Sequence, residues 1–374
     1  MVTERRSGNA VFNSNKLKLG TFATNTVGAV HTVAPDRYHP TWENSLRAAK
    51  AADCAGFEAL LGLARWKSVG GKAPIDHRGG IVLDPFTWAA GIAMATNYCT
   101  VLATSHAPTI HPLVVAKQGA TIDHISGGRF GLNVVGGWNR SEFEMFGQPL
   151  ADHDARYDYM EEWLTVIERL WSASEEFDFD GKFLTLKGAM SRPQPVQQPR
   201  PVIMNAGLSG RGQRFACEYA DCCFVTASIG KEGVQSYKKL AREEFGREVG
   251  VWTQATIVQR DTRQEAEAFL NYFAVQYEDT PAVDAWIAGM VTDVRILNAE
   301  IKIPRITMAT GGDPIVGTAE DIADQLEAFS ERGIDGILMS WFDFDDGIKR
   351  FTEGVLPILE QRGLRAPFQP VVAG

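Results

Sequence analysis

The chain has no long hydrophobic run, little cysteine and no excess of positive charge. No window approaches the roughly 18 consecutive apolar residues that a membrane-spanning helix needs, and the polar N-terminus lacks the apolar stretch of a secretory signal. The 374 residues include 37 Lys and Arg against 46 Asp and Glu, a formal net charge of -9. Because phosphate backbones and anionic lipids attract basic surfaces, binding to nucleic acid or to a membrane is not expected.

Metal and disulfide chemistry are also disfavoured by the sequence. The chain has five cysteines, Cys54, Cys99, Cys217, Cys222 and Cys223. Their odd number and apolar surroundings favour buried, reduced thiols, and the absence of a signal segment favours a cytoplasmic protein. His106 and His111 lie five residues apart on a predicted loop, a spacing that matches neither HExxH nor a Cys/His zinc pattern. No metal site is predicted.

What the sequence does have is an alternation of short apolar runs with longer amphipathic segments, typical of βα units. Strands are predicted over residues 17–22, 57–61, 100–104, 130–135, 202–205, 222–226, 251–258 and 336–339. Helices are predicted over residues 41–55, from 85, and over 113–125, 156–171, 210–219, 231–245, 262–277, 318–332 and 345–361, with a hairpin over 177–186. No GxGxxG follows the first strand, so an α/β fold of the (β/α)8 TIM-barrel class is favoured over an open doubly wound sheet.

One barrel domain is predicted over residues 17–364, between a disordered leader over 1–16 and a C-terminal tail over 365–374. In a parallel barrel the loops that follow the strands gather at the C-terminal face, where active sites lie. The longest predicted connections cover residues 23–40, 62–84, 136–155 and 278–316, which places insertions at that face. The last of them is too long for an ordinary loop and is interpreted as a lid.

Three segments carry polar groups that suit a binding site. Ser209 lies in a Gly-rich string before a predicted helix, where free N–H groups and the helix dipole favour an anion, although simple capping explains it equally well. Asn133 is the single polar side chain within an apolar strand, so it either holds a neighbour or faces a ligand. Arg156 and Tyr157 end an acidic cluster at a helix start, where a solvated first turn is the simpler explanation.

Taken together, these segments resemble a known family. The T-x-D-x-x-S-x-G-R string at residues 121–129 is followed by Gly137-Trp138, Glu142, H-x-x-R-Y at 153–157 and A-G-x-S at 206–209. In order and spacing they resemble the bacterial luciferase-like flavin-dependent monooxygenases, from residue 17 to about residue 364. The closest branch is that of the two-component pyrimidine, alkanesulfonate and dimethylsulfone monooxygenases.

The resemblance implies a barrel that takes reduced FMN from a separate NAD(P)H:flavin reductase and uses it to activate O2. The family's FMN-contact positions fall on Ala64, Arg65, Asn133, Glu142, Arg156, Tyr157 and Ser209. Within the pyrimidine branch the oxygen is placed at flavin N5, in a pocket whose three residues correspond to Leu61, Thr104 and Asn133. The implied reaction is oxygenation of a small substrate through a flavin peroxide, with cleavage of a C–N bond, a C–S bond or a ring.

The substrate and several alternatives stay open. His106, His111 and Trp138 are substrate candidates by loop position, although a structural role is as probable for each histidine. A heterocycle and an organosulfur compound both fit, and Arg65, Lys67 and Lys72 leave an anion open. The alternatives are a flavin- or deazaflavin-dependent dehydrogenase and a flavin-binding protein without activity. A sugar or aldol enzyme would need a Lys or carboxylate pair at the strand ends, which the sequence lacks. A homo-oligomer, dimer or tetramer, is expected.

Overall fold

Eight parallel strands close into a barrel in the computed structural model, which describes residues 8–68, 81–208, 210–291 and 304–369. The strands are β1 (Lys18–Phe22), β2 (Ala59–Gly62), β3 (Thr100–His106), β4 (Phe130–Val135), β7 (Val202–Asn205), β8 (Cys222–Phe224), β9 (Gly250–Gln259) and β11 (Gly336–Ser340). Each pairs with its neighbours in parallel, and the pairing of β8 with β9 closes the ring. The predicted (β/α)8 fold is confirmed.

Helices surround the barrel, and their ends follow local chemistry. The outer layer consists of α1 (Trp42–Cys54), α2 (Pro85–Ala95), α3 (Pro112–Ser126), α5 (His153–Ser172), α6 (Gly210–Tyr219), α7 (Lys231–Phe245), α8 (Arg263–Asn271), α12 (Ala319–Glu331), α13 (Phe344–Arg350) and α14 (Leu356–Gln361). Asp84 caps α2 and precedes a first-turn proline, and Gly127 ends α3 with a left-handed φ of 66°. The helices predicted over 262–277 and 345–361 each contain a π-helical turn, η4 (Tyr272–Gln276) and η5 (Phe351–Val355). The spacing of apolar residues in the sequence does not reveal such a local widening of the helix.

Side chains on each strand alternate between the barrel interior and the helical layer, as the pleat requires. The interior cluster contains Val11, Ala59, Leu61, Leu102, Val202, Met204, Cys222, Trp252 and Leu338. Residues between them, such as Leu60 and Ile203, pack instead in the larger cluster beneath the helices. Four of the five free cysteines are buried as predicted, but Cys54, at the end of α1, is exposed.

The N-terminal segment is not the disordered leader predicted over residues 1–16, at least from residue 8 onward. A 3-10 turn, η1 (Ala10–Phe12), carries Val11 into the interior cluster, so the segment closes the N-terminal opening of the barrel. Asn13 and Asn15 donate to Glu58, and Arg365 donates to the same buried carboxylate at 2.8 Å. The predicted tail over 365–374 therefore begins with a residue that belongs to the packed barrel. Residues 1–7 lie outside the described ranges.

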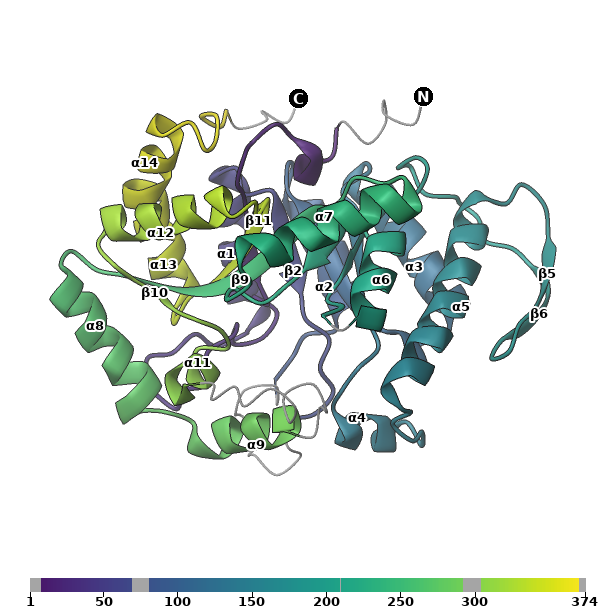
Figure 1. The fold of residues 1–374 in the computed structure, drawn as a ribbon, viewed down its shortest axis with the longest axis horizontal. Coiled ribbons are helices and arrows are strands. Elements are labelled where there is room, and N and C mark those ends of the chain that lie inside the picture. Colours follow the sequence, from purple (N-terminus) through teal and green to yellow (C-terminus); the bar gives the residue numbers. More distant parts are fainter. Residues whose placement is uncertain (1–7, 69–80, 209, 292–303, 370–374) are drawn as a thin grey trace.

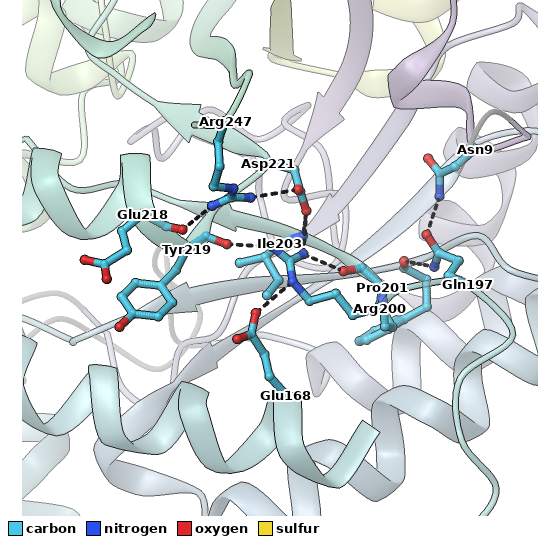
Figure 2. Close-up of polar contacts among 11 residues, drawn as sticks. Asn9, Glu168, Gln197, Arg200, Pro201, Ile203, Glu218, Tyr219, Asp221 and Arg247 are labelled. Carbon is cyan, nitrogen blue, oxygen red and sulfur yellow. Dashed lines mark hydrogen bonds and ion pairs between the residues drawn. The ribbon is translucent and has the colours of Figure 1, made fainter. Parts of the chain in front are cut away.

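A buried carboxylate, Asp221, ties β7 and β8 to the helical layer (Figure 2). Its Oδ2 lies 2.6 Å from Arg200 Nη1 and accepts from the Ile203 N–H at 2.9 Å, while its Oδ1 lies 3.1 Å from Arg247 Nη2. Arg200 Nε also lies 2.8 Å from Glu168 Oε1 on α5. Every polar atom of the carboxylate therefore has a partner, as burial demands.

Replacement Asp221→Asn is expected to lower the free energy of unfolding by about 3 kcal/mol, because it leaves the buried Arg200 guanidinium without its nearest carboxylate. Denaturant melts followed by circular dichroism measure the loss. Glu243→Gln is the control, since Glu243 and Lys239 form an exposed pair 3.9 Å apart worth roughly 0.5 kcal/mol. Equal melting midpoints for the two variants would contradict this assignment.

Insertions gather at the C-terminal face, on the side opposite the chain termini (Figure 1). They include α4 (Arg140–Met145), α9 (Thr280–Val291) and α11 (Arg305–Ala309). Arg305 holds the last two together through ion pairs with Glu278 (2.6 Å) and Asp284 (2.7 Å). A third apolar cluster, which includes Phe273 and Val283, packs this insertion onto the barrel.

The predicted lid over residues 278–316 therefore consists partly of regular structure. Its final residues belong to β10 (Ile315–Gly317), which pairs in parallel with the end of β9, so this part extends the sheet and is no lid. Residues 292–303 of the segment lie outside the described ranges.

The predicted hairpin is present as β5 (Phe177–Asp180) and β6 (Thr185–Ala189), and it lies on the flank of the molecule beyond α5 (Figure 1).

Within the described residues, none of the helices combines the length and the apolar character needed to cross a membrane.

Candidate active site

Leu61, Thr104 and Asn133 meet inside the barrel near the C-terminal ends of three adjacent strands. Thr104 and Asn133 are register partners on β3 and β4, and Asn133 Nδ2 donates to Thr104 Oγ1 at 3.0 Å. The Thr104 hydroxyl in turn donates to the Gly62 carbonyl on β2 at 2.7 Å. All three side chains are buried, and Leu61 belongs to the interior cluster. One amide and one hydroxyl therefore lie near the mouth of the barrel, beside the apolar Leu61 side chain.

Arg65, His106 and Glu142 form a buried group of ionisable side chains at the same end. Arg65 Nε lies 3.6 Å from Glu142 Oε1, and His106 Nδ1 lies 3.8 Å from Glu142 Oε2. Glu142 also accepts from the backbone N–H groups of Trp66 and Lys67, which ties the loop after β2 to α4. Within the described residues, Arg65 Nη1 is buried without a hydrogen-bond partner. A spare buried donor of this kind suits an acceptor atom of a ligand.

Burial dominates the electrostatics of this group. It lowers the pKa of Arg65 and raises the pKa of Glu142, and the attraction between the two charges opposes both shifts. Burial, together with the nearby Arg65 guanidinium, lowers the pKa of His106 to about 4. His106 is therefore a neutral imidazole at pH 7, able to donate and accept one hydrogen bond each.

Because of this shift, we expect the His106 ring to stay neutral from pH 7 to pH 5, where an unperturbed histidine, with pKa about 6.5, becomes protonated. The unfolded chain then binds more protons than the folded chain between about pH 6.5 and about pH 4, so His106 lowers stability as the pH falls through that window. Histidine-selective ¹⁵N NMR, with His106→Gln to assign the signal, measures the titration. A midpoint above pH 6 would contradict the burial argument.

A Gly-rich loop presents Trp138 at the mouth. Gly137 has a φ of +73°, and a Cβ there would lie 2.6 Å from the Phe143 ring, so only glycine fits. Arg156 donates to the Gly137 carbonyl, and Asn139 caps α4. The Trp138 indole remains 42% exposed. It is thus an exposed aromatic ring on a backbone that is held in place from both sides.

The predicted anion site lies at the turn between β7 and α6. A Cβ on Gly207 would lie 2.0 Å from the Gly212 carbonyl oxygen, and one on Gly212 would lie 2.4 Å from the Tyr157 hydroxyl, so two glycines allow a close approach. This brings Tyr157, next to Arg156 at the start of α5, to the first turn of α6. Ser209, the predicted anion-binding hydroxyl, lies outside the described residues.

The remaining predicted residues are placed as follows. Ala64 is buried and precedes Arg65 in the loop after β2. His111 is exposed, and its Nδ1 accepts from the Leu113 N–H at 3.3 Å, which makes it the N-cap of α3. The structure thus gives His111 a structural role and brings His106 and Trp138 to the Arg65 group. Among the described residues, no cluster of His, Cys, Asp and Glu is arranged to hold a metal ion.

Two residues at this end of the barrel were not predicted from the sequence as part of the site. Trp286, on α9, places its ring 5.0 Å from the Trp138 ring and 5.5 Å from the His31 ring. Asn205, at the end of β7, donates to the Val134 carbonyl at 2.7 Å, while its buried Oδ1 has no partner within the described residues. Asn205 ends an apolar strand much as Asn133 interrupts one, so the same signal would have found it. No local signal marks Trp286.

Comparison with known proteins covers most of the chain. The family model of the luciferase-like monooxygenases matches residues 17–336. The chain belongs to the luciferase-like monooxygenase family. It is 32% identical over 366 residues to the pyrimidine monooxygenase RutA of Escherichia coli, covering 92% of this chain and 97% of that protein. The predicted family is confirmed, and the chain is a flavin-dependent monooxygenase.

Solved structures share the fold of this luciferase-like monooxygenase. The long-chain alkane monooxygenase LadA has a TM-score of 0.82 at 24% identity, covering 96% of this chain and 94% of its own. The riboflavin lyase RcaE, solved with modified FMN and riboflavin, has a TM-score of 0.82 at 23% identity, with 94% and 93% covered. An F420-dependent secondary alcohol dehydrogenase also aligns, with a TM-score of 0.69 at 18% identity over 93% and 99%. The fold alone therefore does not separate oxygen transfer from hydride transfer.

Proposed function

We propose that this luciferase-like monooxygenase is the oxygenase component of a two-component system and uses reduced FMN and O2 to oxygenate a small organic substrate. The observation that carries the proposal is the buried Asn133–Thr104 pair, which lies at the same barrel end as the Arg65–Glu142 ion pair. Polar groups with spare hydrogen-bonding capacity, buried at the C-terminal face, are what a ring cofactor with several acceptor atoms needs.

The described residues fit FMN in type and position. Asn205 Oδ1 is a buried acceptor without a partner among the described residues, which suits a donor atom of the cofactor. Ala64, Arg65, Asn133 and Glu142 would contact the ring, while Arg156, Tyr157 and Ser209 would hold the phosphate at the first turn of α6. When bound, reduced FMN supplies the two electrons and the atom at which O2 is activated.

The chain itself would position and protect the reacting atoms. Asn133 and Thr104 would hydrogen-bond the oxygen, which the proposal places beside flavin N5, and Leu61 would exclude water that competes for it. The Asn133 amide is already oriented by its bond to Thr104, and Thr104 by its bond to Gly62. The second N–H of the Asn133 amide therefore needs little rearrangement when charge develops on the oxygen, whereas Thr104 would turn its single O–H from the Gly62 carbonyl in order to donate.

A small heterocycle is the preferred substrate in this proposal, with an organosulfur compound as the second class. The 32% identical relative is named a pyrimidine monooxygenase, and this match covers nearly the whole chain. Oxygenation would then cleave a C–N bond or a ring, or a C–S bond in the second class. His106 and Trp138 would face the substrate, whereas His111 is occupied as a helix cap.

We also propose the partners of the protein and its location in the cell. A separate NAD(P)H:flavin reductase would supply the reduced FMN, because the sequence contains no GxGxxG motif that would bind the nicotinamide nucleotide. Homo-oligomerisation and a cytoplasmic location, consistent with five free cysteines, belong to the same proposal. Within the predicted lid, α9 is the described element that would cover the substrate.

The test is oxygen consumption with chemically reduced FMN and a panel of heteroaromatics, sulfones and sulfonates, followed by product analysis with a generic flavin reductase. The expected result is O2 uptake above autoxidation that depends on one class of substrate and matches the product formed. Reduction or oxidation of a substrate without O2 uptake would favour a dehydrogenase. Tight binding of oxidised FMN with no product would favour a flavin-binding protein without activity.

A further inference from the structure

Two indole rings from separate insertions meet over one buried cation. Trp138, from the loop after β4, and Trp286, from α9, have ring centroids 5.0 Å apart and ring planes at 80°. The Arg65 guanidinium carbon lies 5.2 Å from the Trp138 centroid and 5.9 Å from the Trp286 centroid. His31, from the loop after β1, also contacts Trp286, with ring centroids 5.5 Å apart. Four loops or helices thus contribute to one aromatic and cationic cluster.

The cluster is rigidly supported although it is not fully covered. Trp138 keeps 42% of its surface exposed, while the glycine contact with Phe143 and the cap at Asn139 fix its backbone. Trp286 sits one turn after Val283, which packs in the apolar cluster that anchors the insertion. Exposed aromatic rings on a fixed backbone are typical of recognition sites, because a partner ring covers them with little loss of conformational freedom.

The charge of the cluster selects between ligand classes. Arg65 is paired with Glu142 at 3.6 Å, so the pair carries no net charge toward a ligand. One donor, Arg65 Nη1, has no hydrogen-bond partner within the described residues. A neutral ring with a carbonyl acceptor satisfies that donor, whereas an alkanesulfonate brings a negative charge close to Glu142.

We infer that Trp286 is a specificity-determining residue, and that Trp138, Trp286 and Arg65 together bind a neutral, planar, conjugated ring bearing a carbonyl group. The ring would lie against the exposed Trp138 face, its edge toward Trp286 and its carbonyl toward Arg65, since aromatic rings favour offset and edge-to-face contacts. This inference rests on the proposed function, because it assigns the substrate class of the same site.

The test is equilibrium binding in the presence of saturating FMN, which does not depend on turnover. The planar probes are uracil, nicotinamide and xanthine, and the comparison probes are dihydrouracil and hexane-1-sulfonate. Loss of one aromatic contact in Trp286→Ala is expected to raise the dissociation constant of the preferred planar probe about three- to tenfold, with recovery in Trp286→Phe. Trp42→Ala removes an exposed indole from the start of α1, outside this cluster, and is the control variant.

The inference would be overturned if the wild type bound none of the planar probes more tightly than the comparison probes, or if Trp286→Ala bound the preferred planar probe as tightly as the wild type does. A parallel rise in the FMN dissociation constant of Trp286→Ala would instead assign the ring to the cofactor. If the wild type oxygenates a sulfonate or sulfone with reduced FMN while binding no planar probe, the proposed function stands and this inference fails.

Discussion

Replacement Asn133→Ala is expected to abolish coupled oxygenation while leaving the barrel folded. The substitution removes the amide that donates to Thr104 at 3.0 Å and that we propose holds the reacting oxygen. Loss of one such preorganised donor costs roughly 10²- to 10³-fold in rate in other enzymes. The ratio of product formed to reduced FMN oxidised measures the effect, since uncoupled turnover releases hydrogen peroxide.

Asn271→Ala, on the exposed side of α8, is the matched control and is expected to keep the wild-type ratio. Circular dichroism and the melting midpoint show whether Asn133→Ala is folded. An unchanged product ratio in Asn133→Ala would contradict the role of this amide at the oxygen. It would leave membership of the luciferase-like family untouched, because that rests on the whole chain.

Replacement Glu142→Gln is expected to lower the free energy of unfolding by about 3 kcal/mol and to weaken FMN binding at the same time. Glutamine keeps the size of the side chain and an acceptor for the Trp66 and Lys67 N–H groups. It removes the negative charge, however, and so leaves the buried Arg65 guanidinium uncompensated. Removing one partner of a buried ion pair costs about 3–5 kcal/mol.

Denaturant melts measure the stability, and quenching of flavin fluorescence measures the dissociation constant of FMN. Glu144→Gln is the control, because it changes the same residue type on the same helix, α4, at an exposed position. If both variants melt and bind FMN alike, then the Arg65–Glu142 pair does not organise the mouth of the barrel.

Much of the barrel could be predicted from the sequence because its strands are short apolar runs with clear boundaries. Helices α6 and α7 begin and end where the sequence predicts, since Gly210, Gly230 and Gly246 mark their limits. The leader could not be predicted, because the burial of Val11 depends on an opening that exists only after eight strands close. Local polarity alone made residues 8–16 look disordered.

Site residues could be predicted from the sequence where a polar residue interrupts an apolar strand. Asn133 stands out in its strand for this reason, and its contact with Thr104 follows from the register of two adjacent strands. His106 and His111 look alike in sequence, yet one is buried beside Glu142 and the other caps a helix. Trp286 reaches the site through an insertion whose position depends on tertiary packing, which no spacing in the sequence reports.

A crystal structure of the chain with FMN tests the proposed site most directly. The flavin ring is expected at the C-terminal ends of β3 and β4, within hydrogen-bond distance of Asn133, with the phosphate at the first turn of α6. A flavin at the opposite end, in the 370 Å³ cavity lined by Asn97, Arg129 and Gln197, would contradict it. So would a structure in which the ring lies at the mouth but makes no contact with Asn133.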